Sequence, residues 1–155
     1  MASSVTYRFS QRFNVPARDA YEWCTDYDPN DLSLMNEKGQ RKIQRITDDT
    51  IVLTEVVYQN AKRIRKIKLV KLNPNRLSWY NIQISGPNRY SGFLYEIVPE
   101  SKRRSKLNFT GFLVVYDAKL TSRRLRQKAK AERQYDSNAW KLLAKAMAKD
   151  HGRTR

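Results

Sequence analysis

The fold is constrained most by residues 39–117, where runs of β-branched and aromatic residues are separated by turn sequences and no helical period intervenes. The strongest turn sequences are Asn-Pro-Asn at 73–75 and Gly-Pro-Asn at 86–88. Runs joined by such short turns are typical of antiparallel strands that follow one another in a meander. Glycine inside a strand usually marks a bulge or a bend, which we expect at Gly92 and Gly111. The predicted strands cover residues 40–47, 51–58, 61–72, 77–85, 89–98 and 107–116.

Elements of other kinds flank this meander. Residues 5–15 alternate between apolar and polar side chains, which predicts a first strand with one wet face. After Pro16 the apolar spacing becomes helical, and we expect two short helices near residues 17–24 and 31–35. Residues 120–150 contain no Gly or Pro and keep a three-to-four spacing, so they predict a final helix about 45 Å long. The resulting order, β-α-α-β6-α, is an α+β arrangement.

This order, together with one passage of sequence, resembles the helix-grip superfamily, which includes START, Bet v 1-like and polyketide cyclase or lipid-transport domains (SRPBCC type). The passage is Val-Pro-Ala-Arg-Asp-Ala-Tyr-Glu-Trp at 15–23, followed by an acidic turn, Asp-Tyr-Asp-Pro, at 26–29. The resemblance implies a curved seven-stranded antiparallel sheet wrapped around the C-terminal helix, with an apolar cavity between them. It implies one domain over residues 1–150 and leaves a charged tail at 151–155. The glycine-rich loop that family members often carry between early strands is absent, since Asp-Asp-Thr stands at 48–50.

The implied cavity gives a set of candidate lining residues, which are aromatic side chains of the strands and two positions of the final helix. They are Trp79, Tyr95, Phe109, Phe112, Tyr135 and Ala139. A concave sheet facing a long helix leaves space that a ligand occupies or that side chains fill. The alternative for each of these residues is therefore ordinary packing in the core.

Four acidic residues interrupt apolar patterns: Glu55, Glu96, Glu132 and Asp136. A carboxyl group in a dry cavity has a raised pKa and can act as an acid, a base or a ligand anchor. Glu96 and Glu132 are the candidate catalytic residues. The alternative, which the 31 Lys and Arg residues favour, is that these carboxylates face cations.

The net charge of +16 is the extreme value of the composition. Residues 119–155 alone hold 12 cations against three acids. Two dense groups form a predicted basic surface: Lys62, Arg63, Arg65 and Lys66 on a strand, and Arg123, Arg124, Arg126 and Lys128 on the final helix. Such a surface attracts an anionic membrane, an acidic protein or, with less support, nucleic acid, unless it serves only to keep the chain solvated.

Several classes of site are not expected. With one cysteine, Cys24, and one histidine, His151, we expect no disulfide framework, cysteine-zinc cluster or Ser-His-Asp triad, and no metal or cofactor. The longest apolar run, residues 112–116, is far shorter than the ~18–20 residues of a membrane span. The first residues show no signal-peptide pattern, so we expect a cytoplasmic protein.

Three functions remain open at this stage. The first is binding or transport of a small hydrophobic or amphipathic ligand, such as a lipid, polyketide or isoprenoid, and it rests mainly on the resemblance. The second is a metal-free enzyme of the aromatase/cyclase kind, in which a buried Glu or Tyr transfers protons. The third is a basic adaptor for nucleic acid or an acidic protein, with a filled core.

Overall fold

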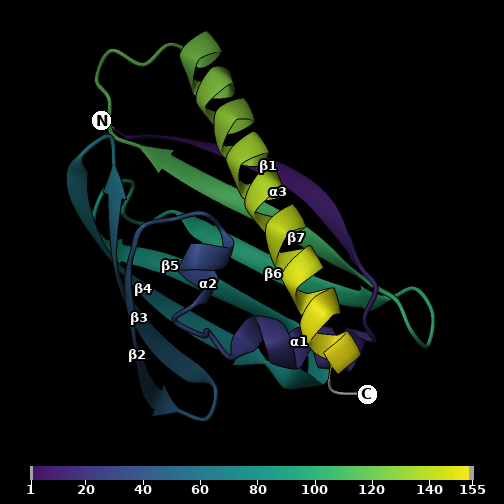
Figure 1. The fold of residues 1–155 in the computed structure, drawn as a ribbon. Coiled ribbons are helices and arrows are strands. Elements are labelled where there is room, and N and C mark those ends of the chain that lie inside the picture. The colour runs from purple at the N-terminus through teal and green to yellow at the C-terminus, as the bar shows by residue number, and fades with distance from the viewer. Residues whose placement is uncertain (1, 154–155) are drawn as a thin grey trace.

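One antiparallel sheet of seven strands forms a curved wall (Figure 1). The computed structural model describes residues 2–153. The strands are β1 (Ser3–Phe13), β2 (Gly39–Thr47), β3 (Thr50–Gln59), β4 (Lys62–Asn73), β5 (Ser78–Ser85), β6 (Gly92–Pro99) and β7 (Ser105–Val115). They lie in the order β1-β7-β6-β5-β4-β3-β2, so β2 to β7 form the predicted meander and β1 pairs with β7.

Three α-helices and one short 3-10 turn complete the fold: α1 (Ala17–Thr25), α2 (Asp31–Leu34), η1 (Pro74–Arg76) and α3 (Ser122–Arg153). The long helix α3 crosses the concave side of the sheet and packs mainly along β1, while α1 lies at the lower end in Figure 1 and α2 lies between β2 and α3. Within residues 2–153, no helix is long and apolar enough to cross a membrane. Residues 151–153 of the predicted tail are helical, and residues 154–155 lie outside the described part.

Burial of every second residue shows which face of the sheet is covered. Along β7 every second residue from Ser105 to Val115 is buried, and along β3 the buried positions run from Ile51 to Val57. Since directly opposed residues of an antiparallel pair point to the same side, this alternation defines one concave face of the sheet.

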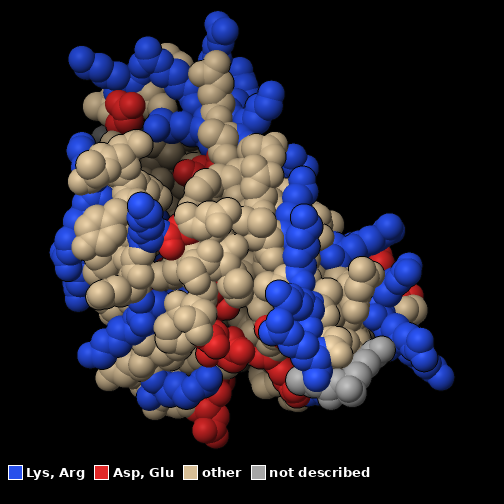
Figure 2. All heavy atoms as spheres, viewed as in Figure 1, with Lys and Arg blue, Asp and Glu red and all other residues tan. Residues whose placement is uncertain are grey.

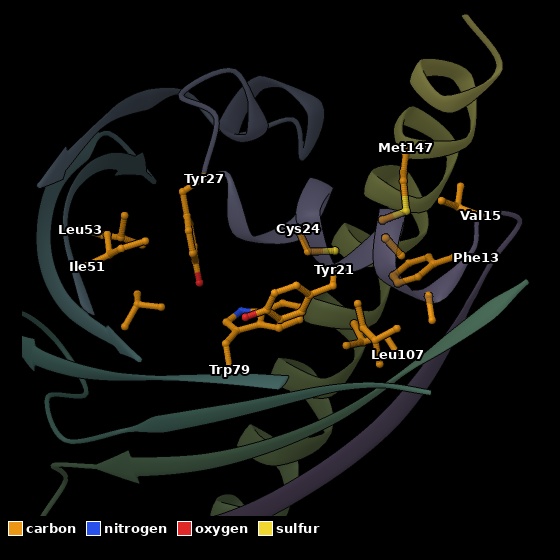
Figure 3. Close-up of a cluster of buried hydrophobic side chains, with 14 residues drawn as sticks. Phe13, Val15, Tyr21, Cys24, Tyr27, Ile51, Leu53, Trp79, Leu107 and Met147 are labelled. Atoms are coloured by element: carbon orange, nitrogen blue, oxygen red, sulfur yellow. The ribbon is translucent and has the colours of Figure 1, made fainter. Parts of the chain in front are cut away.

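The core has two parts. The larger cluster lies near α1, where Phe13, Trp79, Leu107 and Met147 are almost fully buried (Figure 3). A second cluster, centred on Tyr7, Phe9 and Phe109, lies between β1, β7 and α3. The larger cluster therefore fills the α1 end of the concave side, and the second one supports the first half of α3.

Two local predictions were wrong. Pairing runs without interruption through Gly111 and begins at Gly92, and the register shifts lie instead at 45–47 and 67–68. The sixth strand begins at Gly92 and not at residue 89, because Asn88 and Tyr90 have positive φ values and hold the chain in the turn. Both errors concern backbone conformations that side-chain patterns do not report.

Candidate functional site

A row of aromatic rings crosses the concave face. Trp79 of β5, Tyr95 of β6 and Phe109 of β7 are directly opposed in register, and Phe9 of β1 continues the row. The Trp79 and Tyr95 rings are stacked with centroids 4.7 Å apart and an interplanar angle of 2°. Tyr95 meets Phe109 edge-on at 5.1 Å. These cross-strand pairs give the concave face a row of rings in several orientations, an aromatic wall that offers apolar contact to a ring or an alkyl chain.

A tyrosine-carboxyl pair lies against this wall. The Tyr7 hydroxyl of β1 donates to Asp136 Oδ2 of α3 at 2.5 Å. The Tyr7 ring fits there because position 111, opposite it in the sheet, is glycine: a Cβ on Gly111 would lie 2.4 Å from Tyr7 Cζ. The glycine expected to bend the strand thus makes room for a side chain of the candidate site.

Burial sets the protonation of this pair. It raises the pKa of Asp136 to about 6, with a further rise from Glu132 and partial compensation from the Tyr7 hydrogen bond and from Lys68 and Lys66. Burial and the neighbouring Asp136 also raise the pKa of Tyr7 above its usual range. Asp136 can therefore take up and release a proton near neutral pH, while Tyr7 remains protonated.

One buried amide is only half satisfied. Asn81 of β5 is 3% exposed, and its Nδ2 donates to Tyr95 Oη at 3.3 Å. Its Oδ1 has no hydrogen-bond partner among residues 2–153. Because Asn81 opposes Val70 and lies on the same face as Trp79, this acceptor is directed to the concave side. It is a buried acceptor that could accept a hydrogen bond from a ligand.

An ion-pair network joins β2, β3 and β4 to α2. Glu55 Oε2 accepts from Arg41 Nη2 at 2.9 Å, and Lys68 Nζ lies 2.7 Å from Oε1. Burial alone would raise the pKa of Glu55, but the charges and hydrogen bonds of Lys68 and Arg41 outweigh it and lower the value to about 2. Arg41 also reaches Asp31 at 3.3 Å. Glu55 thus faces cations, in agreement with the alternative that the sequence favoured.

The candidate cavity residues divide into two groups. Trp79, Tyr95 and Phe109 lie together on the concave face, and Ala139 is half-buried on α3. Phe112 does not lie on the concave face. The inward positions of β7 have odd numbers, and Phe112 is 44% exposed on the other face.

On α3 the aromatic side chain that reaches the interior is Trp140, whose ring lies 5.8 Å from that of Tyr95. Tyr135, which we predicted there, is 48% exposed, because it lies to one side of the inward stripe through Asp136 and Leu143.

The candidate catalytic residues need one correction. Glu96 is exposed on the convex face, opposite Ser78 and Asn108, and faces no dry cavity. It borders a surface groove of about 750 Å³ beside η1, which does not include Tyr7, Asn81 or Asp136. Glu132 is half-buried one helical turn before Asp136 and adds to the negative charge around Tyr7.

Sequence reasoning missed Tyr7 and Asn81 and passed over Asp136. Tyr7 shared the apolar side of the first strand with Phe9, and the 79-81-83 alternation of β5 placed Asn81 beside Trp79. Both signals were present in the sequence, but pairing Tyr7 with Asp136, 129 residues away, requires the structure. No group of three His, Cys, Asp or Glu side chains suited to a metal ion lies within residues 2–153.

Comparison with known proteins gives a likeness in structure. No family model matches the sequence. No curated protein matches it either. The ZhuI aromatase/cyclase from Streptomyces sp. R1128 superposes with a TM-score of 0.78 at 17% identity, covering 99% of this chain and 97% of that one. TTHA0849 from Thermus thermophilus superposes with a TM-score of 0.73 at 12% identity, covering 92% of this chain and 97% of that one. The chain has the helix-grip fold.

A third helix-grip structure gives the same result. The di-domain ARO/CYC BexL from the BE-7585A biosynthetic pathway matches with a TM-score of 0.70 at 14% identity, covering 96% of this chain and half of BexL. In the helix-grip fold of the present chain, the aromatic wall, Asn81 and the Tyr7–Asp136 pair all lie between the sheet and α3. Figure 2 shows the surface hollowed beside the first half of this helix, with acidic atoms in the hollow.

Proposed function

We propose that this chain binds a small amphipathic molecule between the sheet and α3, with an apolar or ring-bearing body and at least one hydroxyl group. The class includes lipids, polyketides and isoprenoids. The observation that carries the proposal is the unpaired Asn81 Oδ1, which lies beside Tyr95 and the aromatic wall. A buried acceptor without a partner costs about 1–3 kcal/mol, which a ligand donor would recover.

The polar groups also indicate what the ligand must offer. Asn81 Oδ1 requires a donor. Tyr95 Oη already accepts from Asn81 Nδ2, so its own proton is available to a ligand acceptor. A hydroxyl group satisfies both, since it donates through its proton and accepts through its lone pairs. The stacked Trp79 and Tyr95 rings would support the apolar body. Two of the structural neighbours are named as aromatase/cyclase proteins, in keeping with a ring-bearing ligand.

The test uses two aromatic probes that differ in one proton. Isothermal titration with 2-naphthol and with 2-methoxynaphthalene compares a hydroxyl donor with an ether that cannot donate. We expect 2-naphthol to bind about five- to tenfold more tightly, the value of one hydrogen bond. Asn81→Ala should remove this preference, and Asn108→Ala, an asparagine of the convex face, should keep it. Equal affinity of the unaltered protein for both probes, or no binding, would overturn the proposal.

A metal-free enzyme is the second candidate, and the Tyr7–Asp136 pair favours it. A carboxyl group whose pKa is raised to about 6 is suited to proton transfer at neutral pH. Asp136 replaces Glu96 and Glu132 as the group for this role. Molecules extracted from purified protein with organic solvent are returned to stripped protein and followed by mass spectrometry and chromatography. Conversion of these molecules would support an enzyme if Asp136→Asn abolishes it while retaining binding and Glu96→Gln stays active. If the molecules are returned unchanged, only the binding function is supported.

A further inference from the structure

One end of the molecule combines cations with exposed tyrosines. It consists of the turns β3–β4 and β5–β6, the loop from β7 to α3 and the first turns of α3, and we name it the basic end. Its residues are Tyr58, Lys62, Arg63, Arg65, Arg89, Tyr90, Tyr116, Lys119, Arg123, Arg124, Arg126 and Lys128. Figure 1 shows the start of α3 and these turns on the same side of the molecule, and Figure 2 shows Lys and Arg atoms gathered there.

Contacts between the turns hold this surface in place. The Arg89 guanidinium lies over the Tyr116 ring at 5.4 Å and over the Tyr90 ring at 5.8 Å. The Tyr116 hydroxyl donates to the Arg89 carbonyl at 2.9 Å, which ties the turn β5–β6 to the loop before α3. Tyr58, Tyr90 and Tyr116 nevertheless remain 46–60% exposed. Amphipathic rings that stay exposed among cations are suited to a boundary between water and an apolar phase.

A group of acids lies at the opposite end, although Asp117 belongs to the loop before α3 at the basic end. Residues 17–37, which include α1 and α2, hold six acids and a single cation, Arg18. Asp150, near the end of α3, accepts from Trp23 Nε1 of α1 at 2.9 Å and adds to this group. Red atoms accordingly cluster at the lower end in Figure 2. A molecule polarised in this way turns its basic end toward any extended anionic surface.

The start of α3 strengthens the field in an unusual manner. Thr121 Oγ1 accepts from Arg124 N at 3.2 Å and caps the helix, but the first turn contains Arg123 and Arg124 and no acid. Cations at the positive end of a helix dipole are unfavourable for folding. A sequence that departs from the preference for acids at a helix N-terminus, without a benefit to folding, is expected at a functional surface. Here the helix dipole and the cations together attract anions.

We propose that the basic end docks on the surface of an anionic lipid bilayer. Lys and Arg side chains would meet the headgroups and the three tyrosines would enter the interfacial region. The choice of a bilayer over nucleic acid rests on the proposed function, since the hollow beside α3 opens near this end and a bilayer is the natural reservoir of an amphipathic ligand. The bilayer also accounts for the exposed tyrosines of the basic end.

The test is co-sedimentation with phosphatidylcholine vesicles, with and without phosphatidylglycerol, at low and high salt. Two triple variants remove the same charge. R123Q/R124Q/R126Q changes the basic end, whereas K102Q/R103Q/R104Q changes the exposed β6–β7 loop at the other end of β7. Each cation near an anionic surface contributes about fivefold to affinity, so the first variant should bind roughly 100-fold more weakly. The second variant should bind as the unaltered chain does.

The remaining outcomes also decide the matter. Y58S/Y90S should weaken the binding that survives high salt, because the tyrosines act through burial and not through charge. Equal loss in both triple variants would show that only net charge acts and would overturn the proposal. So would the absence of binding at low salt, or tighter binding to single-stranded RNA that depends on the same arginines. Because no ligand is added to the vesicles and no membrane to the naphthol titration, failure of docking and failure of ligand binding remain distinguishable.

Discussion

At the scale of single residues, the interior depends on one close approach. Gly111 leaves the space in which the Tyr7 ring lies, and this placement brings the Tyr7 hydroxyl to Asp136. Glycine here serves packing and not backbone flexibility, since Gly86 is the glycine with positive φ. The candidate site is therefore sensitive to a single methyl group at position 111.

The matched test compares alanine at two strand glycines. At Gly111 a Cβ would lie 2.4 Å from Tyr7 Cζ, while at Gly92 it would lie 3.7 Å from the Asn81 carbonyl oxygen. We expect Gly111→Ala to destabilise the fold by about 1–3 kcal/mol, as overpacking does, and Gly92→Ala to cost less. Urea unfolding measures both. Equal costs would mean that the Tyr7 ring moves aside freely.

The Tyr7–Asp136 pair also predicts how stability depends on pH. Burial raises the pKa of Asp136 to about 6, so between about pH 4 and pH 6 the folded chain keeps a proton that the unfolded chain has released. This contribution to stability is present at low pH and declines as the pH rises through that range. At this half-buried site we expect it to amount to about 1 kcal/mol.

The decline is tested by denaturant unfolding across this pH range. The unaltered chain is compared with Asp136→Asn and Asp48→Asn. Asp136→Asn should remove the decline, and Asp48→Asn, which removes the same charge from an exposed turn, should retain it. Below about pH 4 a separate loss of folding stability is expected. Glu55, whose pKa is lowered to about 2, loses its ion pairs with Arg41 and Lys68 when it is protonated. A pH profile of Asp136→Asn identical to that of the unaltered chain would contradict this view of Asp136.

At the scale of elements, α3 carries cations at both of its ends, although the helix dipole favours them only at the C-terminus. Arg124 and Arg153 are exposed in the first and last turns. Arg124→Glu should therefore stabilise the fold and Arg153→Glu destabilise it, each by about 0.3–1 kcal/mol. Thermal unfolding at low ionic strength distinguishes the two, and added salt should reduce both shifts. Shifts of the same sign would mean that total charge outweighs the dipole.

The elements show how far the sequence reaches. Alternating and helical patterns predicted every strand and helix to within a few residues, because burial on one face imposes a period on the sequence. The apolar run at 112–116 has no such period, so it could not show that Phe112 points outward. The role of Asn81 depends on its being opposite Val70 and beside Tyr95, and the register of neighbouring strands depends on the turns that join them and is not encoded in either strand alone.

At the scale of the whole molecule, three features share one axis. The larger apolar cluster and a group of acids lie at the α1 end, the half-satisfied Asn81 lies between the sheet and α3, and nine of the 31 cations gather at the basic end. A net charge of +16 gave no preference for a fold, but its distribution gives the molecule a direction. In this arrangement the interior determines which ligand is held and the basic end determines where it is exchanged.

The most direct test of the central claim is the position of a bound probe, measured by side-chain amide NMR during titration with 2-naphthol. Binding between the sheet and α3 predicts that the Asn81 amide and the Trp140 indole signals shift together. The competing location is the surface groove beside η1, which is lined by Asn73 and Asn75. Shifts confined to these two amides, with Asn81 unchanged at saturation, would contradict the account.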